Sequence, residues 1–257
     1  MLKSYLREQR NKKDILLMTH IVLGYPSFED SFRIVAEMVE AGVDIMELQI
    51  PFSEPIADGP VILKANQRSL AAGSTVEKCI AFAEKAVQTF SIPFLFMSYY
   101  NILFKYGVRR FAGVMAETGL KGAIVPDLPP EEGAEYIEVM ADHKLAPIFI
   151  FTPTTSMERM KKIAGCADGF IYCVARRGVT GADTEFSLEF QKYIERCRSA
   201  TDLPLALGFG VKEKADIDFL RGKVDIAVIG TQTIRIVEKE GVDAVGGFIR
   251  GLRSESK

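Results

Sequence analysis

The chain has 257 residues, of which 48% are hydrophobic and 26% are charged, and its formal net charge is −2. This balance is typical of a globular protein with a sizeable core, and it argues against a nucleic-acid-binding protein or a highly charged tail. Residues 1–14 lack the apolar core of a signal peptide, and no apolar run of about 18 residues occurs in the sequence. We therefore expect a cytoplasmic protein.

Cysteine and histidine spacing predicts no metal site. The chain contains four cysteines and two histidines, which are Cys79, Cys166, Cys173, Cys197, His20 and His143. No two cysteines form a C-x-x-C pair, and both histidines are far from every cysteine in the sequence. Zinc sites normally show such close spacing, so we expect no bound metal.

Eight short apolar runs are predicted to be strands. Each is rich in β-branched or aromatic residues and is bounded by glycine, proline or polar residues. They lie at residues 15–24, 43–50, 92–99, 121–127, 146–151, 169–175, 203–210 and 224–230. Runs that are apolar almost throughout are typical of parallel strands covered on both faces.

The segments between these runs show helical spacing. In residues 27–42 the apolar side chains fall on one stripe, and Gly42 ends the pattern. Similar patterns predict further helices at residues 76–90, 108–119 and 131–144. The alternation of eight strands with helices predicts an α/β protein, and specifically one (β/α)8 TIM barrel made of residues 1–257.

Two carboxylates belong to the end of the second strand, where the active site of such a barrel is built. Glu47 lies within the apolar run 43–50. A buried carboxylate serves either as a catalytic acid or base or as a structural partner, and the sequence favours neither. Asp58 follows in "PIADGP". Asp before Gly is most often turn chemistry, but together the two carboxylates could divide proton transfer and charge stabilisation between them.

Glycines end the last two predicted strands, in "LGFGV" (207–211) and "IGTQ" (229–232). Loops after strands seven and eight often bind phosphate in this fold, so these residues favour a phosphorylated ligand. The segment 175–186 after the sixth strand has the composition of a lid or of an ordinary surface loop.

Several motifs together resemble the tryptophan synthase alpha subunit family. "MELQIPFSEPIADGPVI" (46–62) is similar to that family's signature. The resemblance continues in order through the segments "LGYP" (23–26), "MSYYNILFKYG" (97–107), "VPDLPPEE" (125–132), "GFIYCVARRGVTG" (169–181) and "LGFGV".

The resemblance implies a barrel with an additional N-terminal helix, matching "LKSYLREQR" (2–10). It also implies cleavage of indole-3-glycerol phosphate to indole and glyceraldehyde 3-phosphate in tryptophan biosynthesis, without a metal or organic cofactor. Indole would pass to a beta subunit that carries pyridoxal phosphate, in an α2β2 heterotetramer. Two alternatives stay open: a weakly active paralogue that serves as an allosteric binding subunit, and a stand-alone lyase that releases indole.

Matching motif by motif implies roles for individual residues. Glu47 matches the general acid–base residue, and Asp58 the carboxylate that binds the indole nitrogen proton. Tyr172 matches an active-site tyrosine, and Thr180 a threonine that positions Asp58 from the lid. The phosphate-binding positions, together with a neighbouring phenylalanine, match Gly181, Gly210, Gly230, Thr231 and Phe209.

The sequence departs from the family pattern in and near the site. His20 stands where phenylalanine is common, Gln49 where glycine is usual, Glu54 in place of Asp, Ile102 in place of Pro, and "GTQT" in place of "GSA". We expect His20 and Gln49 to contact the substrate. Because Gln49 should point inward like Glu47, we also expect its amide to donate to Glu47 and to slow the reaction. Alternatively, Gln49 turns outward and binds a loop.

Overall fold

The computed structural model describes residues 1–175, 183–208 and 210–253, without the side chains of 183–187. Within these residues, parallel strands form a closed barrel in the order β1 to β8. The strands are β1 (Leu16–Val22), β2 (Ile45–Gln49), β3 (Phe94–Met97), β4 (Gly122–Ile124), β5 (Ala146–Phe151), β6 (Ile171–Val174), β7 (Leu205–Gly208) and β8 (Ile226–Ile229). The predicted fold class and all eight predicted strands are confirmed.

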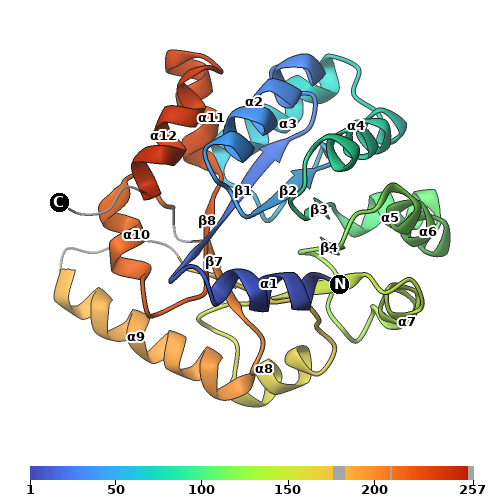
Figure 1. Cartoon of the computed structure of the whole chain (residues 1–257). Coiled ribbons are helices and arrows are strands. Elements are labelled where there is room, and N and C mark those ends of the chain that lie inside the picture. Colours follow the sequence, from blue (N-terminus) through green and yellow to red (C-terminus); the bar gives the residue numbers. More distant parts are fainter. Residues whose placement is uncertain (176–182, 209, 254–257) are drawn as a thin grey trace.

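Helices surround the strands, as Figure 1 shows. They are α2 (Phe28–Glu40), α3 (Pro60–Ala71), α4 (Val76–Thr89), α5 (Tyr100–Tyr106), α6 (Val108–Thr118), α7 (Ala134–Asp142), α8 (Met157–Ala164), α9 (Asp183–Ala200), α10 (Lys214–Leu220), α11 (Thr231–Glu240) and α12 (Ala244–Arg253). The helices predicted within 27–42, 76–90, 108–119 and 131–144 are present. None of the described helices has the length and apolar character that a membrane span requires.

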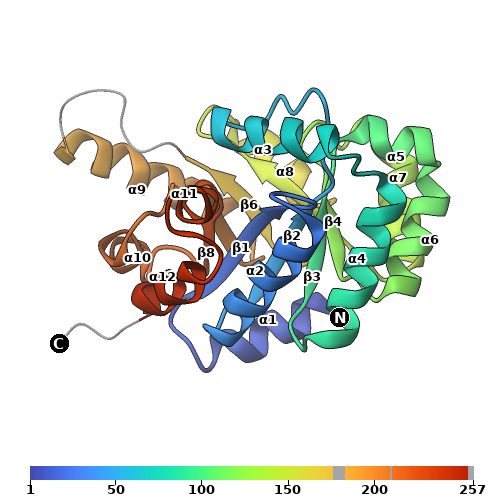
Figure 2. The ribbon, with the colours of Figure 1, turned by 90° about the horizontal axis from the view of Figure 1, so that it is seen from above.

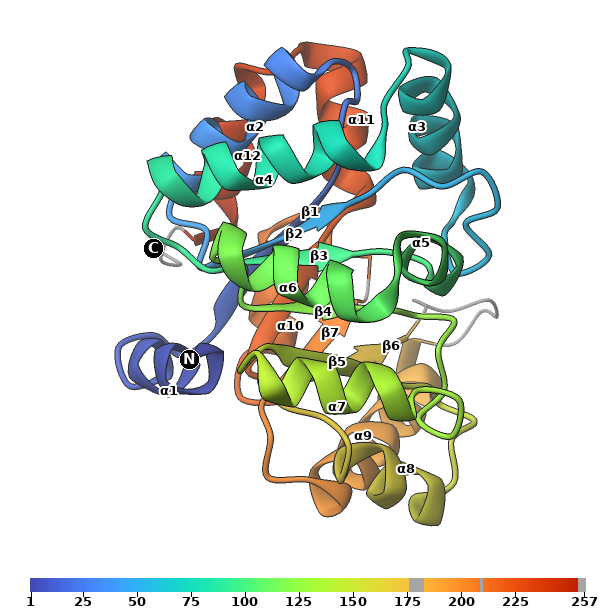
Figure 3. The ribbon, with the colours of Figure 1, turned by 90° about the vertical axis from the view of Figure 1, so that its right-hand side faces the viewer.

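The additional N-terminal helix, α1 (Leu2–Arg10), covers the end of the barrel where the strands begin. Figures 1 and 2 show it crossing that end, and Figure 3 shows it far from α3 and α5. Leu2 and Leu6 are buried in one cluster with Ile148 and Phe170 of the barrel. Apolar side chains thus close this end and leave the opposite end for a ligand.

Side chains alternate between the barrel interior and the surrounding helices, as parallel strands require. Leu16, Met18 and Ile45 belong to the interior cluster, whereas Leu17 and Met46 pack in the cluster beneath the helices. In the parallel register β1 and β2 place His20 opposite Glu47. Two polar side chains therefore meet at the open end of an otherwise apolar interior.

Buried acids at the strand starts have a structural role. Asp44, just before β2, accepts a hydrogen bond from the backbone of Leu17 and pairs with Lys13 and Arg253. Asp225, just before β8, pairs with Arg10 and Arg198. Each acid is already paired with two neighbouring cations. We therefore assign these carboxylates to holding the starts of the strands in place and not to binding a ligand.

Candidate active site

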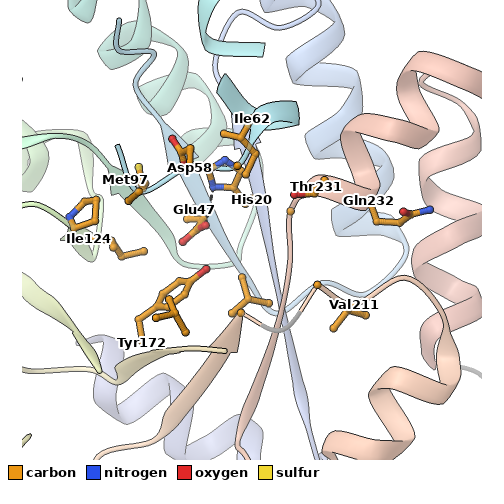
Figure 4. A pocket seen from close by; sticks show the side chains of 18 of the residues that line it. His20, Glu47, Asp58, Ile62, Met97, Ile124, Tyr172, Val211, Thr231 and Gln232 are labelled. Atoms are coloured by element: carbon orange, nitrogen blue, oxygen red, sulfur yellow. Dashed lines mark hydrogen bonds and ion pairs between the residues drawn. The ribbon is translucent and has the colours of Figure 1, made fainter. Parts of the chain in front are cut away.

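A cavity of about 370 Å³ opens at the carboxyl ends of the strands. Figure 4 shows the side chains that line it. The predicted site residues among them are His20, Glu47, Asp58, Tyr172, Gly210, Gly230 and Thr231. The structure therefore gathers residues from β1, β2, β6 and the loops after β2, β7 and β8 at one place.

Glu47 is held by His20. Both side chains are only 4% exposed, and His20 Nδ1 lies 2.7 Å from Glu47 Oε1. Among the described residues, nothing hydrogen-bonds to Glu47 Oε2. One carboxylate oxygen is thus fixed by the imidazole, and the other is free to meet a substrate proton.

Opposing effects set the pKa of the His20 imidazole. Burial lowers it and is the largest single effect, but the charge and hydrogen bond of Glu47 and the charge of Asp58 together raise the pKa above its ordinary value. The imidazole therefore holds its proton more readily than a solvated histidine, so His20 can pair with Glu47 as a cation.

Asp58 is held by two donors. Gln49 Nε2 lies 2.6 Å and the Tyr99 hydroxyl 3.0 Å from Asp58 Oδ2. Tyr99 also accepts a hydrogen bond of 3.1 Å from the Ala57 backbone and stacks on Phe52. Burial, followed by the Asp58 charge, raises the pKa of the Tyr99 phenol, so it stays protonated and donates. Both donors bind Oδ2, which leaves Oδ1 for a ligand.

The local fold explains how Asp58 reaches the pocket. The turn before it is closed by the Asp58 amide, which donates to the Pro55 carbonyl at 2.9 Å. Gly59 then caps α3, whose first residue is Pro60. Proline suits the first position of a helix, where its missing N–H is not needed. The turn at Pro55 and the helix start at Pro60 thus fix the loop that carries Asp58.

The expected hydrogen bond from Gln49 to Glu47 is wrong. Gln49 is fully buried on the inward side of β2, but its amide donates to Asp58. His20 takes the place beside Glu47. The alternative prediction was that Gln49 turns outward and binds a loop. Its partner Asp58 does lie in the loop after β2, but the Gln49 side chain stays inside the barrel.

Tyr172 points toward the two carboxylates from across the pocket (Figure 4). Burial raises the pKa of its phenol well above the ordinary value, and the charges of Glu47 and Asp58 add to this effect. The neutral ring packs against Gly208, where an added Cβ would lie 3.1 Å from the ring. A larger residue at Gly208 would therefore displace Tyr172.

Gly210, Gly230 and Thr231 line the other side of the cavity together with the cations Lys212 and Arg235. Gly230 caps the N-terminus of α11, and the backbone N–H groups of a first helical turn favour anions. Thr180, Gly181, Phe209 and residues 176–182 of the expected lid lie outside the described residues.

Tyr99 and Gly208 were not predicted to act in the site. Both were within reach of sequence reasoning, since Tyr99 lies in "MSYYN" at a strand end and Gly208 precedes Gly210 in "LGFG". Their partners are distant in sequence: Asp58 is 41 residues from Tyr99. Motif spacing alone does not supply such contacts.

Comparison with known proteins shows the family to which the chain belongs. A sequence model described as tryptophan synthase alpha chain matches residues 6–249. The tryptophan synthase alpha chain of Desulforapulum autotrophicum is 62% identical over 98% of this chain and 100% of that protein, and that of Syntrophotalea carbinolica is 60% identical with the same coverage. The crystal structure of tryptophan synthase subunit alpha from Legionella pneumophila has a TM-score of 0.88 at 29% identity, covering 98% of this chain and 96% of that one. The chain belongs to the tryptophan synthase alpha chain family.

Proposed function

We propose that this chain cleaves indole-3-glycerol phosphate with Glu47 as the general acid–base residue and Asp58 as the partner of the indole N–H. The lyase activity in tryptophan biosynthesis follows from family membership. The observation that supports the two roles is the convergence of two carboxylates on one cavity, each with one oxygen held by neighbouring side chains.

Each role follows from the chemistry of the reaction. Glu47 gives a proton to indole C3, which makes the ring a leaving group for the C3–side-chain bond. As that bond breaks, the side-chain hydroxyl loses its proton to Glu47 and becomes the aldehyde of glyceraldehyde 3-phosphate, so the proton count balances. Positive charge that develops on the ring nitrogen is stabilised by ionised Asp58.

The phosphate group is proposed to bind where Gly210 and the N-terminus of α11 line the cavity, near Lys212 and Arg235. Gly210 has φ +79, a conformation that favours glycine, and an added Cβ would meet no atom within 4 Å. We expect Gly210→Val to raise KM for the phosphorylated substrate by about tenfold or more, because it shifts the backbone that faces the phosphate. Steady-state kinetics with indole-3-glycerol phosphate measures this change.

Gly222→Val is the matched control. Gly222 also has positive φ, +71, with open space at its Cβ, but it precedes β8 at the end of the barrel away from the cavity. Both variants should lose similar stability, and only Gly210→Val should change KM. An equal KM in wild type and Gly210→Val would place the phosphate elsewhere.

The partner is proposed to be a tryptophan synthase beta subunit that holds pyridoxal phosphate, in an α2β2 assembly, whereas this chain needs no cofactor of its own. Two exposed apolar side chains, one before α3 and one on α5, support an interface at the end of the barrel opposite α1 (Figure 3). Ile56, in the Asp58 loop, is 80% exposed, and Phe104, on α5, is 69% exposed.

The deciding assay measures indole release from indole-3-glycerol phosphate, first by this chain alone and then with a beta subunit. Slow cleavage that the beta subunit accelerates is the expected result. Full activity without a partner would support the stand-alone lyase. Absence of cleavage in both conditions, with the beta reaction still stimulated, would support the allosteric binding subunit and overturn the proposed roles of Glu47 and Asp58.

A further inference from the structure

The His20–Glu47 contact has the features of a built pair rather than an incidental one. The two residues are register partners on adjacent strands, both point into the barrel, and both are almost completely buried. Their contact of 2.7 Å leaves Glu47 Oε2 and His20 Nε2 without a hydrogen-bond partner among the described residues. The charge and the hydrogen bond of Glu47 both raise the pKa of the His20 imidazole, so the imidazole responds to the carboxylate it contacts.

Charged and titratable groups approach the pair from several elements. Asp58 faces it from the loop after β2, and Tyr172 from β6. Lys212, after β7, and Arg235, on α11, line the same cavity. On the β8 side the neighbour is Gly230, where an added Cβ would lie 3.4 Å from His20 Cβ. The charges that raise the pKa of the His20 imidazole are those of Glu47 and Asp58, which favours an extra proton on the pair.

We propose that His20 is a positioning residue of the lyase reaction, which fixes Oε1 of Glu47 and shares one titratable proton with it, so that Oε2 alone exchanges protons with the substrate. This inference rests on the proposed role of Glu47. His20 itself does not touch the reacting carbon: it acts through the carboxylate.

The pair accounts for both proton transfers. When it carries its extra proton, His20 Nδ1–H donates to Oε1 while the proton on Oε2 moves to indole C3. The resulting carboxylate keeps the Nδ1–H hydrogen bond, which is stronger to a charged acceptor. Oε2 then takes the proton of the side-chain hydroxyl as the carbon–carbon bond breaks. The pair ends with the proton count with which it began.

Two variants separate positioning from proton sharing. His20→Phe removes both the hydrogen bond and the titratable ring. His20→Asn keeps a donor near the place of Nδ1 but does not titrate. We measure kcat/KM from pH 5 to 9, because this parameter reports the pKa values of the free enzyme.

In His20→Phe we expect kcat/KM to fall by about tenfold or more, because Glu47 loses the donor that fixes Oε1. The alkaline limit of the pH profile should also move, because the imidazole whose pKa Glu47 raises is gone. In His20→Asn the rate at acid pH should recover in large part, while the alkaline limit stays shifted. If the alkaline limit is the same in wild type and both variants, Glu47 titrates without His20 and the inference is overturned.

A second measurement needs no turnover. The chain has only two histidines, His20 and the exposed His143. With histidine labelled with ¹⁵N, the His143→Gln variant assigns the His20 signal. We expect His20 to titrate at lower pH in Glu47→Gln than in wild type, since the variant lacks the negative charge that raises the pKa of His20. Identical titrations would show that the pair does not share a proton.

The two proposals fail in different ways. If wild type cleaves the substrate and Glu47→Gln does not, but the His20 variants leave the pH profile unchanged, only the role of His20 is wrong. If Glu47→Gln remains active, the role of Glu47 fails, whatever the ¹⁵N titration shows.

Discussion

Glu47→Gln is expected to lower the lyase rate by about 10²–10⁴-fold, the usual cost of losing a positioned acid–base group. The amide has nearly the shape of the carboxylic acid, and its oxygen can still accept from His20 in place of Oε1. It cannot give a proton to C3 or accept one from the hydroxyl. The measurement is kcat for indole formation, with circular dichroism to confirm the fold.

Asp44→Asn is a suitable control for this experiment. Asp44 is another buried carboxylate of the barrel, but it pairs with Lys13 and Arg253 at the opposite end. Its loss should lower the melting temperature and leave kcat of the folded protein near the wild-type value. More than about a tenth of the wild-type rate in Glu47→Gln would refute the catalytic assignment.

Asp58→Asn is expected to lower kcat/KM by about 10²-fold, which is the scale seen when one preorganised stabilising group is removed. The variant lacks the negative charge that stabilises the ring nitrogen. It also has one oxygen instead of two. If that oxygen accepts from Gln49 and Tyr99, as Asp58 Oδ2 does, the NH₂ group faces the indole N–H, and two donors oppose each other. Kinetics with the substrate and binding of an indole analogue both report this loss.

Gln49→Gly and Tyr99→Phe each remove one donor and keep the charge. Both should therefore lower kcat/KM less than Asp58→Asn does, by roughly tenfold, which corresponds to the lower end of about 1.5 kcal/mol for a hydrogen bond to a charged group. This expectation reverses the sequence-based one, in which glycine at position 49 would speed the reaction. A faster Gln49→Gly variant would show that the contact with Asp58 restrains the site rather than supports it.

The strands could be predicted because each is a local apolar pattern with clear boundaries, as in β5, where the predicted and observed ranges coincide. Helix α7 shows the limit of such reasoning. The acids Glu131 and Glu132 suggested a helix start, but α7 begins at Ala134, because residues 129–133 form turns closed by the carbonyls of Pro129 and Pro130. Acidic residues favour a helix N-terminus in general, but they do not determine at which of several neighbouring residues the helix begins.

The sequence predicts which strand ends contribute residues to the site, but it does not predict which side chains contact each other there. Two inward residues on paired strands, His20 and Glu47, could have been matched from the parallel register alone. The partner of Gln49 could not, because the position of Asp58 depends on the turn at Pro55, on the start of α3 and on Tyr99, the N-cap of α5. Contacts that depend on three separate elements require the tertiary structure.

Closure of the barrel through β1 and β8 also has a consequence for synthesis of the protein. Leu16 pairs with Ile226, so β1 gains its second neighbour only after β8, the last strand of the barrel, has been synthesised. Arg253, which completes the ion pairs of Asp44, leaves the ribosome later still. Until then the nascent chain presents β1 as an open edge with unpaired backbone groups, the kind of surface on which strands of other molecules can pair. Protection by chaperones would matter most during this interval, before the eighth strand arrives.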